Sequence, residues 1–330
     1  MINLRSLAAS VIIGLVAAAF TMSAMAADSL SLRLNWKMKG EFTPFIVAKK
    51  KGYFSEQGLD VAVNEGTSAT QALQTVASGQ DHIAYVPSIQ LIKAVNQGMP
   101  VKAIATVVKI DPMGFVSKAR VKLTKPTDLE GRTVEISPAS TFSQIWEAFA
   151  RKHNIDVGKV KVVRANPAAR FNLLLSDKVD ILADIFVTNE YPVLEAKAGE
   201  KLNVLRVGDW GFRLLGYTLA ANQDLIKNRP DVLKRFNTAA IKGFRFTMEH
   251  PDEAAALAAK EYPDALQEKT TKGQVAQLVD FLQRGEPKQL FVGDHEGWER
   301  TLGILSGSGV ISDRKPVDAY YTNAFVPGSS

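Results

Sequence analysis

The sequence contains two blocks in which strand-like and helix-like segments alternate, and this alternation restricts the chain to α/β architectures. The first block covers residues 31–108 and the second covers residues 132–197. In each block, short apolar or alternating segments are followed by longer segments whose apolar residues have helical spacing. Strands that are joined through helices form parallel sheets. The sequence therefore predicts two β-α-β-α units, each built around a parallel sheet.

Two turn-rich segments mark the places where the chain passes between these units. Ile110–Gly114 interrupts the pattern after the first block, and Gly208–Arg213 does so after the second. Lobes that are joined by two short crossings can close on a ligand by bending at a hinge. We therefore predict two α/β lobes with two crossover segments and a ligand cleft between them, the C-terminal helices covering the first lobe. The predicted boundaries place residues 27–110 and 216–330 in lobe 1 and residues 111–215 in lobe 2.

The first 26 residues have the pattern of a secretory signal peptide. Arg5 is the only charged residue before Asp28, Leu7–Phe20 is apolar, and Ala24–Ala26 has the small-x-small form of a cleavage site. The apolar run is short and directly precedes that site, which favours a cleaved signal over a membrane anchor. We expect the mature chain to begin at Ala27 and to be exported.

The composition narrows the class of protein further. The chain has no cysteine, which excludes disulfides, thiolate metal sites, a cysteine nucleophile and a lipid-modified N-terminal cysteine. An exported chain without a lipid attachment point is expected to be a free periplasmic protein. The formal charge is +6, but the densest basic run, Lys49–Lys51, lies on a predicted helix and is interpreted as a solvated face. No aromatic residues alternate with basic ones as a nucleic-acid surface requires, so we expect no nucleic-acid partner.

Trp36 is the first candidate for a ligand contact. It follows the predicted strand Ser31–Leu34 and precedes a helix whose first turn contains Pro44. In open α/β sheets ligands bind at the carboxyl ends of strands, and the indole ring is a flat platform for a planar or alkyl group. The alternative is that Trp36 covers the core.

Hydroxyl residues recur at the predicted strand-to-helix junctions. Ser68 and Thr70 lie at one junction, Pro87 and Ser88 start a second helix, and Ser140 with Thr141 leads into a third. Hydroxyls and backbone amides at a helix start bind oxygen-bearing anionic groups. The alternative is helix capping, which explains some of these hydroxyls. At the first junction Ser68 or Thr67 is the expected cap, and Gln71 lies three residues after Ser68.

Several further residues are candidates because of their charge or position. Arg170 and Arg213 lie near predicted strand or loop ends of lobe 2, and arginine pairs bidentately with carboxylate or sulfonate. The alternative for each is a salt bridge. Asp184 lies near the end of a buried strand and therefore needs a partner, which is a ligand, a cap or a buried pair. The candidate set is completed by these loop and crossover residues: Glu41, Phe42, Met113 and Glu190.

Several motifs occur in a consistent order over most of residues 30–260. They are Leu34-Asn35-Trp36, Pro44–Val61, Ser78–Asp81, Gly98–Val101, Asp128–Val134, Asn222 with Asn228–Leu233, and Pro251–Ala254. In this combination the sequence resembles the periplasmic solute-binding proteins of ABC importers, in the nitrate, sulfonate/taurine and thiamine-pyrimidine precursor branch. The resemblance implies a type II periplasmic binding protein fold, a monomer without a cofactor, and delivery of a small-molecule ligand to an ABC permease in the inner membrane.

The resemblance leaves two ligand classes open. In the pyrimidine-binding members an acidic residue near Glu190 would face the ligand's amine, whereas the sulfonate and nitrate members favour the hydroxyl donors that Ser68, Thr70, Ser140 and Thr141 could supply. Phe42 stands where the pyrimidine-binding members have a histidine, which puts contacts made by that histidine in doubt. The expected ligand is a carboxylate- or sulfonate-headed molecule or a flat nitrogen heterocycle.

Two rival functions use the same fold. A periplasmic enzyme is disfavoured because the four histidines lack metal-ligand spacing and no G-x-S-x-G motif is present. The resemblance implies that family members that make the thiamine pyrimidine contain a cysteine-rich motif, and this chain has no cysteine. A ligand-sensing partner of a membrane receptor would use the same clamp. We predict that the protein is not an enzyme and holds no metal.

Overall fold

The first of two sheets is built from strands that are distant in the sequence. It contains β1 (Asp28–Leu34), β2 (Leu59–Asn64), β3 (Ile83–Pro87), β4 (Val101–Thr106) and β10 (Tyr217–Asn222). The computed structural model describes residues 27–138, 140–166 and 168–329, so the predicted signal peptide lies outside the described residues. The strand order is β2-β1-β3-β10-β4, with β1 parallel to β2 and β3, and β10 antiparallel to β3 and β4.

The second sheet has the same arrangement. It contains β5 (Met113–Lys118), β6 (Thr133–Glu135), β7 (Lys161–Val163), β8 (Ile181–Phe186) and β9 (Leu202–Arg206), in the order β7-β6-β8-β5-β9. Here β6 is parallel to β7 and β8, and β5 is antiparallel to β8 and β9. The strands of each predicted β-α-β-α unit are parallel, and one further strand in each sheet, β10 in the first and β5 in the second, is antiparallel to them. Each of these strands enters its sheet from a crossover, at the edge where the neighbouring parallel strands end. It therefore runs in the opposite direction to them.

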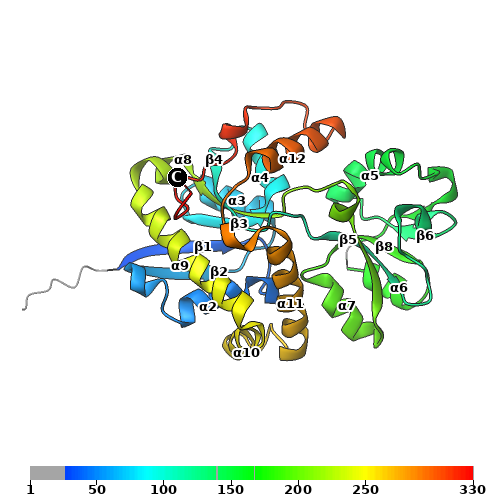
Figure 1. Ribbon diagram of the computed structural model, residues 1–330, viewed down its shortest axis with the longest axis horizontal. Coiled ribbons are helices and arrows are strands. Elements are labelled where there is room, and N and C mark those ends of the chain that lie inside the picture. Colours follow the sequence, from blue (N-terminus) through cyan, green and yellow to red (C-terminus); the bar gives the residue numbers. More distant parts are fainter. Residues whose placement is uncertain (1–26, 139, 167, 330) are drawn as a thin grey trace, which may run out of the picture.

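Figure 1 shows the two lobes side by side, each with its helices packed around its own sheet. Lobe 2 carries α5 (Thr141–Lys152), α6 (Arg170–Leu175) and α7 (Glu190–Ala198). The remaining helices cover lobe 1, as predicted for the C-terminal ones: α2 (Thr43–Lys50), α3 (Ala69–Ala77), α4 (Ser88–Asn96), α8 (Gln223–Asn228), α9 (Pro230–Glu249), α10 (Pro251–Glu261), α11 (Glu268–Arg284) and α12 (His295–Gly307). Among the described residues, none of the helices is both long and apolar enough to span a bilayer.

The two crossovers run side by side. They are residues 107–112, between β4 and β5, and residues 211–216, between the short helix η5 (Val207–Trp210) and β10. The Asp111 amide donates to the Leu214 carbonyl at 2.8 Å, and the Gly216 amide donates to the Val108 carbonyl at 2.9 Å. A Cβ atom on Gly216 would lie 2.8 Å from two carbonyl oxygens of the other crossover, so only glycine allows this approach. The predicted lobe boundaries fall within these segments and stay a prediction.

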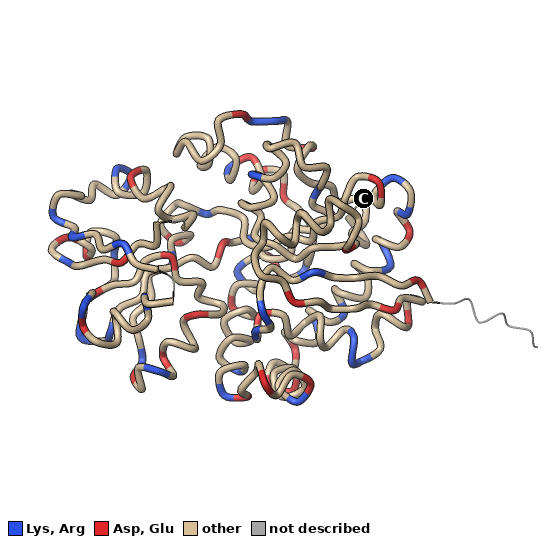
Figure 2. Tube along the Cα trace, turned by 180° about the vertical axis from the view of Figure 1, so that it is seen from behind, with Lys and Arg blue, Asp and Glu red and all other residues tan. Residues whose placement is uncertain are grey.

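Charged residues of both signs are interspersed over both lobes (Figure 2). The basic run on α2 follows this pattern, because Lys50 pairs with Glu261 at 2.7 Å and Lys51 pairs with Glu253 at 3.0 Å. Exposed pairs of this kind contribute about 0–1 kcal/mol each. The run is accounted for as a solvated helix face.

Candidate functional site

Two adjoining cavities lie between the lobes. One has a volume of about 700 Å³ and the other about 1050 Å³, and Trp36, Asn166 and Phe186 line both. We treat them as one cleft, with an inner part toward Asp184 and an outer part toward α7 and α11. Ligand sites are concave and are usually lined by apolar groups with a few well-placed polar ones.

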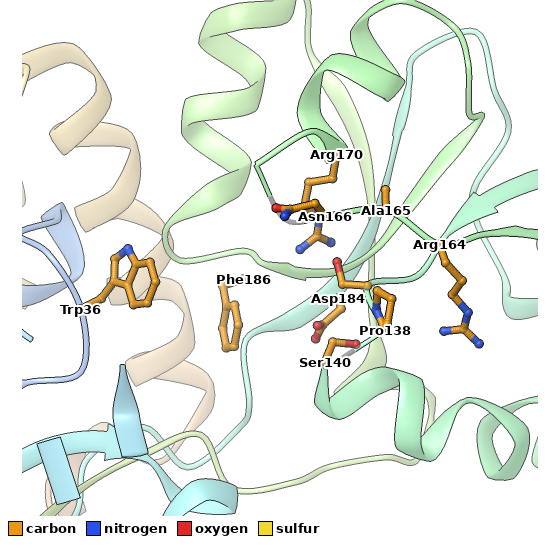
Figure 3. Close-up of a pocket in the computed structure, with 10 residues that line it drawn as sticks. Trp36, Pro138, Ser140, Arg164, Ala165, Asn166, Arg170, Asp184 and Phe186 are labelled. Carbon is orange, nitrogen blue, oxygen red and sulfur yellow. The ribbon is translucent and has the colours of Figure 1, made fainter. Parts of the chain in front are cut away.

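The cleft has an aromatic ring on each side (Figure 3). Trp36 follows β1 in lobe 1 and is 49% exposed, whereas Phe186 ends β8 in lobe 2. The Trp36 carbonyl accepts from the Gly66 amide at 3.1 Å, and a Cβ atom on Gly66 would lie 2.0 Å from the Leu34 carbonyl oxygen. Glycine at this position therefore lets the loop after β2 pack against the end of β1. The two rings can contact opposite faces of a flat ligand when the lobes close.

Asp184 is directed into the cleft by an irregularity of β8. The pairing with β5 shifts so that two residues, Ala183 and Asp184, oppose the single residue Phe115, and Asp184 has a φ of +57°. Such a bulge redirects a side chain, and a non-glycine residue with positive φ is costly unless the surroundings impose it. Figure 3 shows the carboxyl group facing the cavity beside Ser140.

Burial raises the pKa of Asp184 to about 7, and the nearby Arg170 charge and the Ser140 side chain oppose this shift. Burial likewise raises the pKa of Asp111, in the first crossover, to about 7, although its carboxylate accepts from the Met113 amide at 3.0 Å. Both groups therefore bind protons more tightly in the folded chain than in the unfolded chain.

We expect this difference to make stability fall as the pH rises. The stabilising contribution of each carboxyl is complete below its unfolded pKa and is lost as the pH rises through its folded value, about 7. Urea unfolding at pH 5.5 and pH 8 should show the wild type losing more than about 1 kcal/mol. Asp184→Asn should reduce this loss, because asparagine tolerates positive φ and does not ionise. If Asp184→Asn loses as much free energy of unfolding between pH 5.5 and pH 8 as the wild type does, Asp184 is not a source of the pH dependence. Asp111→Asn measures the contribution of Asp111 in the same way.

Arg170 is buried and surrounded by acceptors. Its Nε atom lies 3.3 Å from Glu135 Oε2, its Nη1 atom lies 3.9 Å from Glu190 Oε1, and Nη2 donates to the Ala183 carbonyl. Burial raises the pKa of Glu135, while the Arg170 charge and a hydrogen bond from Ser137 at 3.0 Å lower it. The buried positive charge of Arg170 is thus matched by carboxyl groups of the protein itself.

Aromatic side chains continue from the cleft into lobe 1. Tyr217 lies 6.5 Å from Phe186 between ring centroids and stacks on Tyr85 at 4.9 Å. Tyr85 in turn meets the edge of Phe42 at 6.0 Å. The floor of the cleft is therefore continuous with the lobe 1 core.

Five of the residues predicted from the sequence line the cleft: Trp36, Ser140, Arg170, Asp184 and Glu190. Ser140 also caps α5, since its hydroxyl accepts from the Ser143 amide at 3.0 Å. Figure 3 shows most of these side chains approaching one space from several segments.

The structure places the other predicted residues outside the cavity lining: Glu41, Phe42, Ser68, Thr70, Pro87, Ser88, Met113, Thr141 and Arg213. Phe42 is fully buried in the lobe 1 core, and Ser88 and Met113 are buried as well. Ser68 caps α3 by accepting from the Gln71 amide at 3.1 Å, which confirms the predicted cap. Arg213 donates to the Arg284 carbonyl on α11. Glu41 accepts from Thr188 of lobe 2 at 3.2 Å.

The sequence did not identify several residues of the lining. Phe186 could have been found by the rule that identified Trp36, because it ends a strand of a mainly parallel sheet. Arg164–Asn166 follows β7 in the same way and lines the inner part. Gln274 lies on α11, more than 200 residues from Trp36, and no local pattern indicates that it reaches the cleft.

The model of the family described as "NMT1/THI5 like" matches residues 39–254, which is more than half of the chain. The chain belongs to the NMT1/THI5-like family. Its curated relatives include binding proteins and enzymes. It is 28% identical over 310 residues to the riboflavin-binding protein RibY of Chloroflexus aurantiacus, covering 92% of this chain and 87% of the relative.

Two further relatives differ in described function. The formylaminopyrimidine-binding protein of Halalkalibacterium halodurans is 27% identical, covering 85% of each chain. The 4-amino-5-hydroxymethyl-2-methylpyrimidine phosphate synthase of Legionella pneumophila is 22% identical, covering 90% of this chain and 92% of the relative. Membership of the NMT1/THI5-like family therefore does not by itself separate binding from catalysis.

Solved structures confirm the predicted fold of this NMT1/THI5-like protein. The periplasmic aliphatic sulphonate binding protein SsuA of Escherichia coli superposes with a TM-score of 0.69 at 13% identity, covering 88% of this chain and 91% of SsuA. At that identity the likeness establishes the type II periplasmic binding fold and nothing about the ligand. Among the residues that the structure describes, no group of His, Asp and Glu could hold a metal ion.

Proposed function

We propose that the mature chain is the periplasmic substrate-binding component of an ABC importer and that it captures a flat nitrogen heterocycle between its lobes. The observation that carries the proposal is the pair of rings, Trp36 and Phe186, which face the same cleft from opposite lobes. A planar ligand stacked between them favours closure, since it contacts both rings at once only when the lobes are near each other.

The charges of the cleft support a heterocycle over a free sulfonate or carboxylate. An anion in the inner part would have to compete with Glu135 and Glu190 for Arg170 and would lie beside Asp184. Bringing a second anion into such a buried site is costly. A ring that presents N–H groups would instead donate to these carboxyl groups.

The outer part of the cleft also provides few unpaired positive charges for an anionic ligand. Lys37 pairs with Glu65 at 3.3 Å, and Lys39 pairs with Glu41 at 3.4 Å. Lys197 is exposed. In the inner part, Figure 3 shows the Arg164 side chain directed away from Trp36 and Phe186. Two of the binding-protein relatives are described as binding riboflavin and formylaminopyrimidine, which are ring compounds of the proposed class.

Binding is proposed over catalysis because the described lining of the cleft offers neither a histidine nor a cysteine as a nucleophile or general base. Among the described residues, no histidine lines either cavity, and the chain has no cysteine. Export by the predicted signal peptide and the absence of cysteine support a free periplasmic monomer that delivers its ligand to a membrane permease.

A thermal-shift screen tests the proposal. Riboflavin, aminopyrimidines, aliphatic sulfonates and aromatic carboxylates are added separately to the mature chain. A ligand at a hundredfold excess over its Kd adds about 2.7 kcal/mol to the free energy of unfolding, which is a clear shift in melting temperature. We expect the ring compounds to give the largest shifts, with calorimetry giving the Kd. A shift confined to sulfonates would overturn the ligand class, and turnover of any compound would overturn the binding function.

A further inference from the structure

Helix α11 belongs to the cover of lobe 1 but also contacts lobe 2. It packs on α10 and on the short helix η1 (Gly40–Phe42), with Val275, Leu278 and Phe281 buried. Its other face lies against α7, as Figure 1 shows between the lobes. The lobes are therefore connected by non-covalent contacts in addition to the two crossovers.

Gln274 is the buried polar residue through which α11 contacts lobe 2. The side chain is 5% exposed, and its Oε1 atom accepts from the Gly40 amide of lobe 1 at 2.8 Å. Its Nε2 atom lies 3.0 Å from the carbonyl and 3.2 Å from the side-chain oxygen of Asn189 in lobe 2. The side-chain amide of Gln274 therefore hydrogen-bonds to both lobes, through its oxygen to Gly40 in lobe 1 and through its nitrogen to Asn189 in lobe 2.

The same face of α11 continues along the second sheet. Asp280 pairs with Arg206 at 3.0 Å, and Arg284 lies 3.4 Å from the Asp209 carboxylate. Gly273, Asp280 and Arg284 lie on one side of the helix, together with Gln277, whose side-chain oxygen accepts from Arg206 at 3.5 Å, and Gln274 adjoins them. Gly273 allows the close approach at its start, because a Cβ atom there would lie 2.9 Å from Pro192 Cβ.

We propose that this face of α11, which comprises Gly273, Gln274, Asp280 and Arg284, is an interlobe latch, and that Gln274 is a positioning residue that sets the separation of the lobes. The contacts are polar and therefore reversible: when the lobes part, water replaces each hydrogen bond at little net cost. An apolar interface of the same size would resist opening. The ion pairs are partly exposed and contribute less than the buried amide.

The latch proposal depends on the proposed function in one respect only, which is that the separation of the lobes controls ligand capture. Its test therefore uses no ligand. The chain contains no cysteine, so a pair of spin labels can be attached at Gln74→Cys on α3 and Glu147→Cys on α5, which are exposed positions on different lobes. Double electron–electron resonance then gives the distribution of distances between the lobes.

Two variants disturb the latch in different ways. Gln274→Leu removes the hydrogen bonds to both lobes at similar volume. Gly273→Ala favours the helix but places a methyl group against Pro192, which pushes α7 away without threatening the fold. The matched controls are Gln283→Leu, at an exposed position of the same helix, and Gly303→Ala, where a Cβ atom meets nothing within 4 Å.

We expect both latch variants to shift the distance distribution to larger values and to broaden it, while both controls reproduce the wild type. Melting curves recorded on the same samples verify that each variant is folded. An unchanged distribution in either folded latch variant would overturn the proposal. Failure of the ligand screen would leave this result unaffected, so the two proposals fail separately.

Discussion

Replacing Arg170 with methionine is expected to lower the free energy of unfolding by about 3–5 kcal/mol. The guanidinium group is buried and is the positive partner of Glu135, whose own side chain is fully buried. Removing one member of a buried ion pair leaves the other charge without compensation. Urea unfolding at pH 7.5, monitored by circular dichroism, measures the effect.

Two controls separate this mechanism from a general loss of packing. Arg164→Met removes an exposed guanidinium that donates to the Ile136 carbonyl at 3.4 Å, so it should cost less than about 1 kcal/mol. Adding Glu135→Gln to Arg170→Met should restore at least half of the loss, since no buried charge then remains in this pair. Equal costs for the two arginine variants would refute the buried pair as the cause.

Trp36→Ala is expected to weaken binding of the ring compound with the largest thermal shift by about 10- to 100-fold, which corresponds to about 1–3 kcal/mol. The indole is half exposed and faces the cleft, so its removal deletes one side of the aromatic pair while leaving the core intact. Calorimetric titration gives the affinity, and the melting temperature without ligand should change little.

The chain provides a matched tryptophan for comparison. Trp210 in η5 lies against His153, with ring centroids 6.0 Å apart, and lines neither cavity. Trp210→Ala should therefore leave the affinity within about twofold of the wild type, a change of less than 0.5 kcal/mol. Trp36→Phe should retain most of the affinity, because a smaller ring still stacks. If Trp36→Ala binds as tightly as Trp210→Ala, the aromatic pair does not form the site.

Local patterns predicted the features that depend on neighbouring residues. The alternation of strands and helices, the cap at Ser68 and the position of Trp36 at a strand end all follow from short segments of sequence. Each is decided by backbone propensity, capping or periodicity within a few residues. Glycines in both predicted crossover segments, together with Pro112 in the first, also interrupt the alternation of strands and helices.

Features that depend on pairing between distant segments could not be predicted. The sequence does not show that β5 and β10 insert antiparallel into their sheets, because strand direction is set by where a crossover ends. The bulge that directs Asp184 into the cleft depends on its register with β5. Hydroxyls at the helix starts suggested anion binding, but the charges around Arg170 are balanced by residues up to 35 positions away.

The sequence by itself determined the class of fold, the two-lobe plan and one wall of the cleft, because these rest on local periodicity and on the rule for strand ends. Only the tertiary structure decided which side chains meet in the cleft and which charges remain for a ligand. Arg170 and Gln274 illustrate the reason: the role of each depends on the groups that folding brings within hydrogen-bond distance, and those groups belong to segments that are not adjacent in the chain.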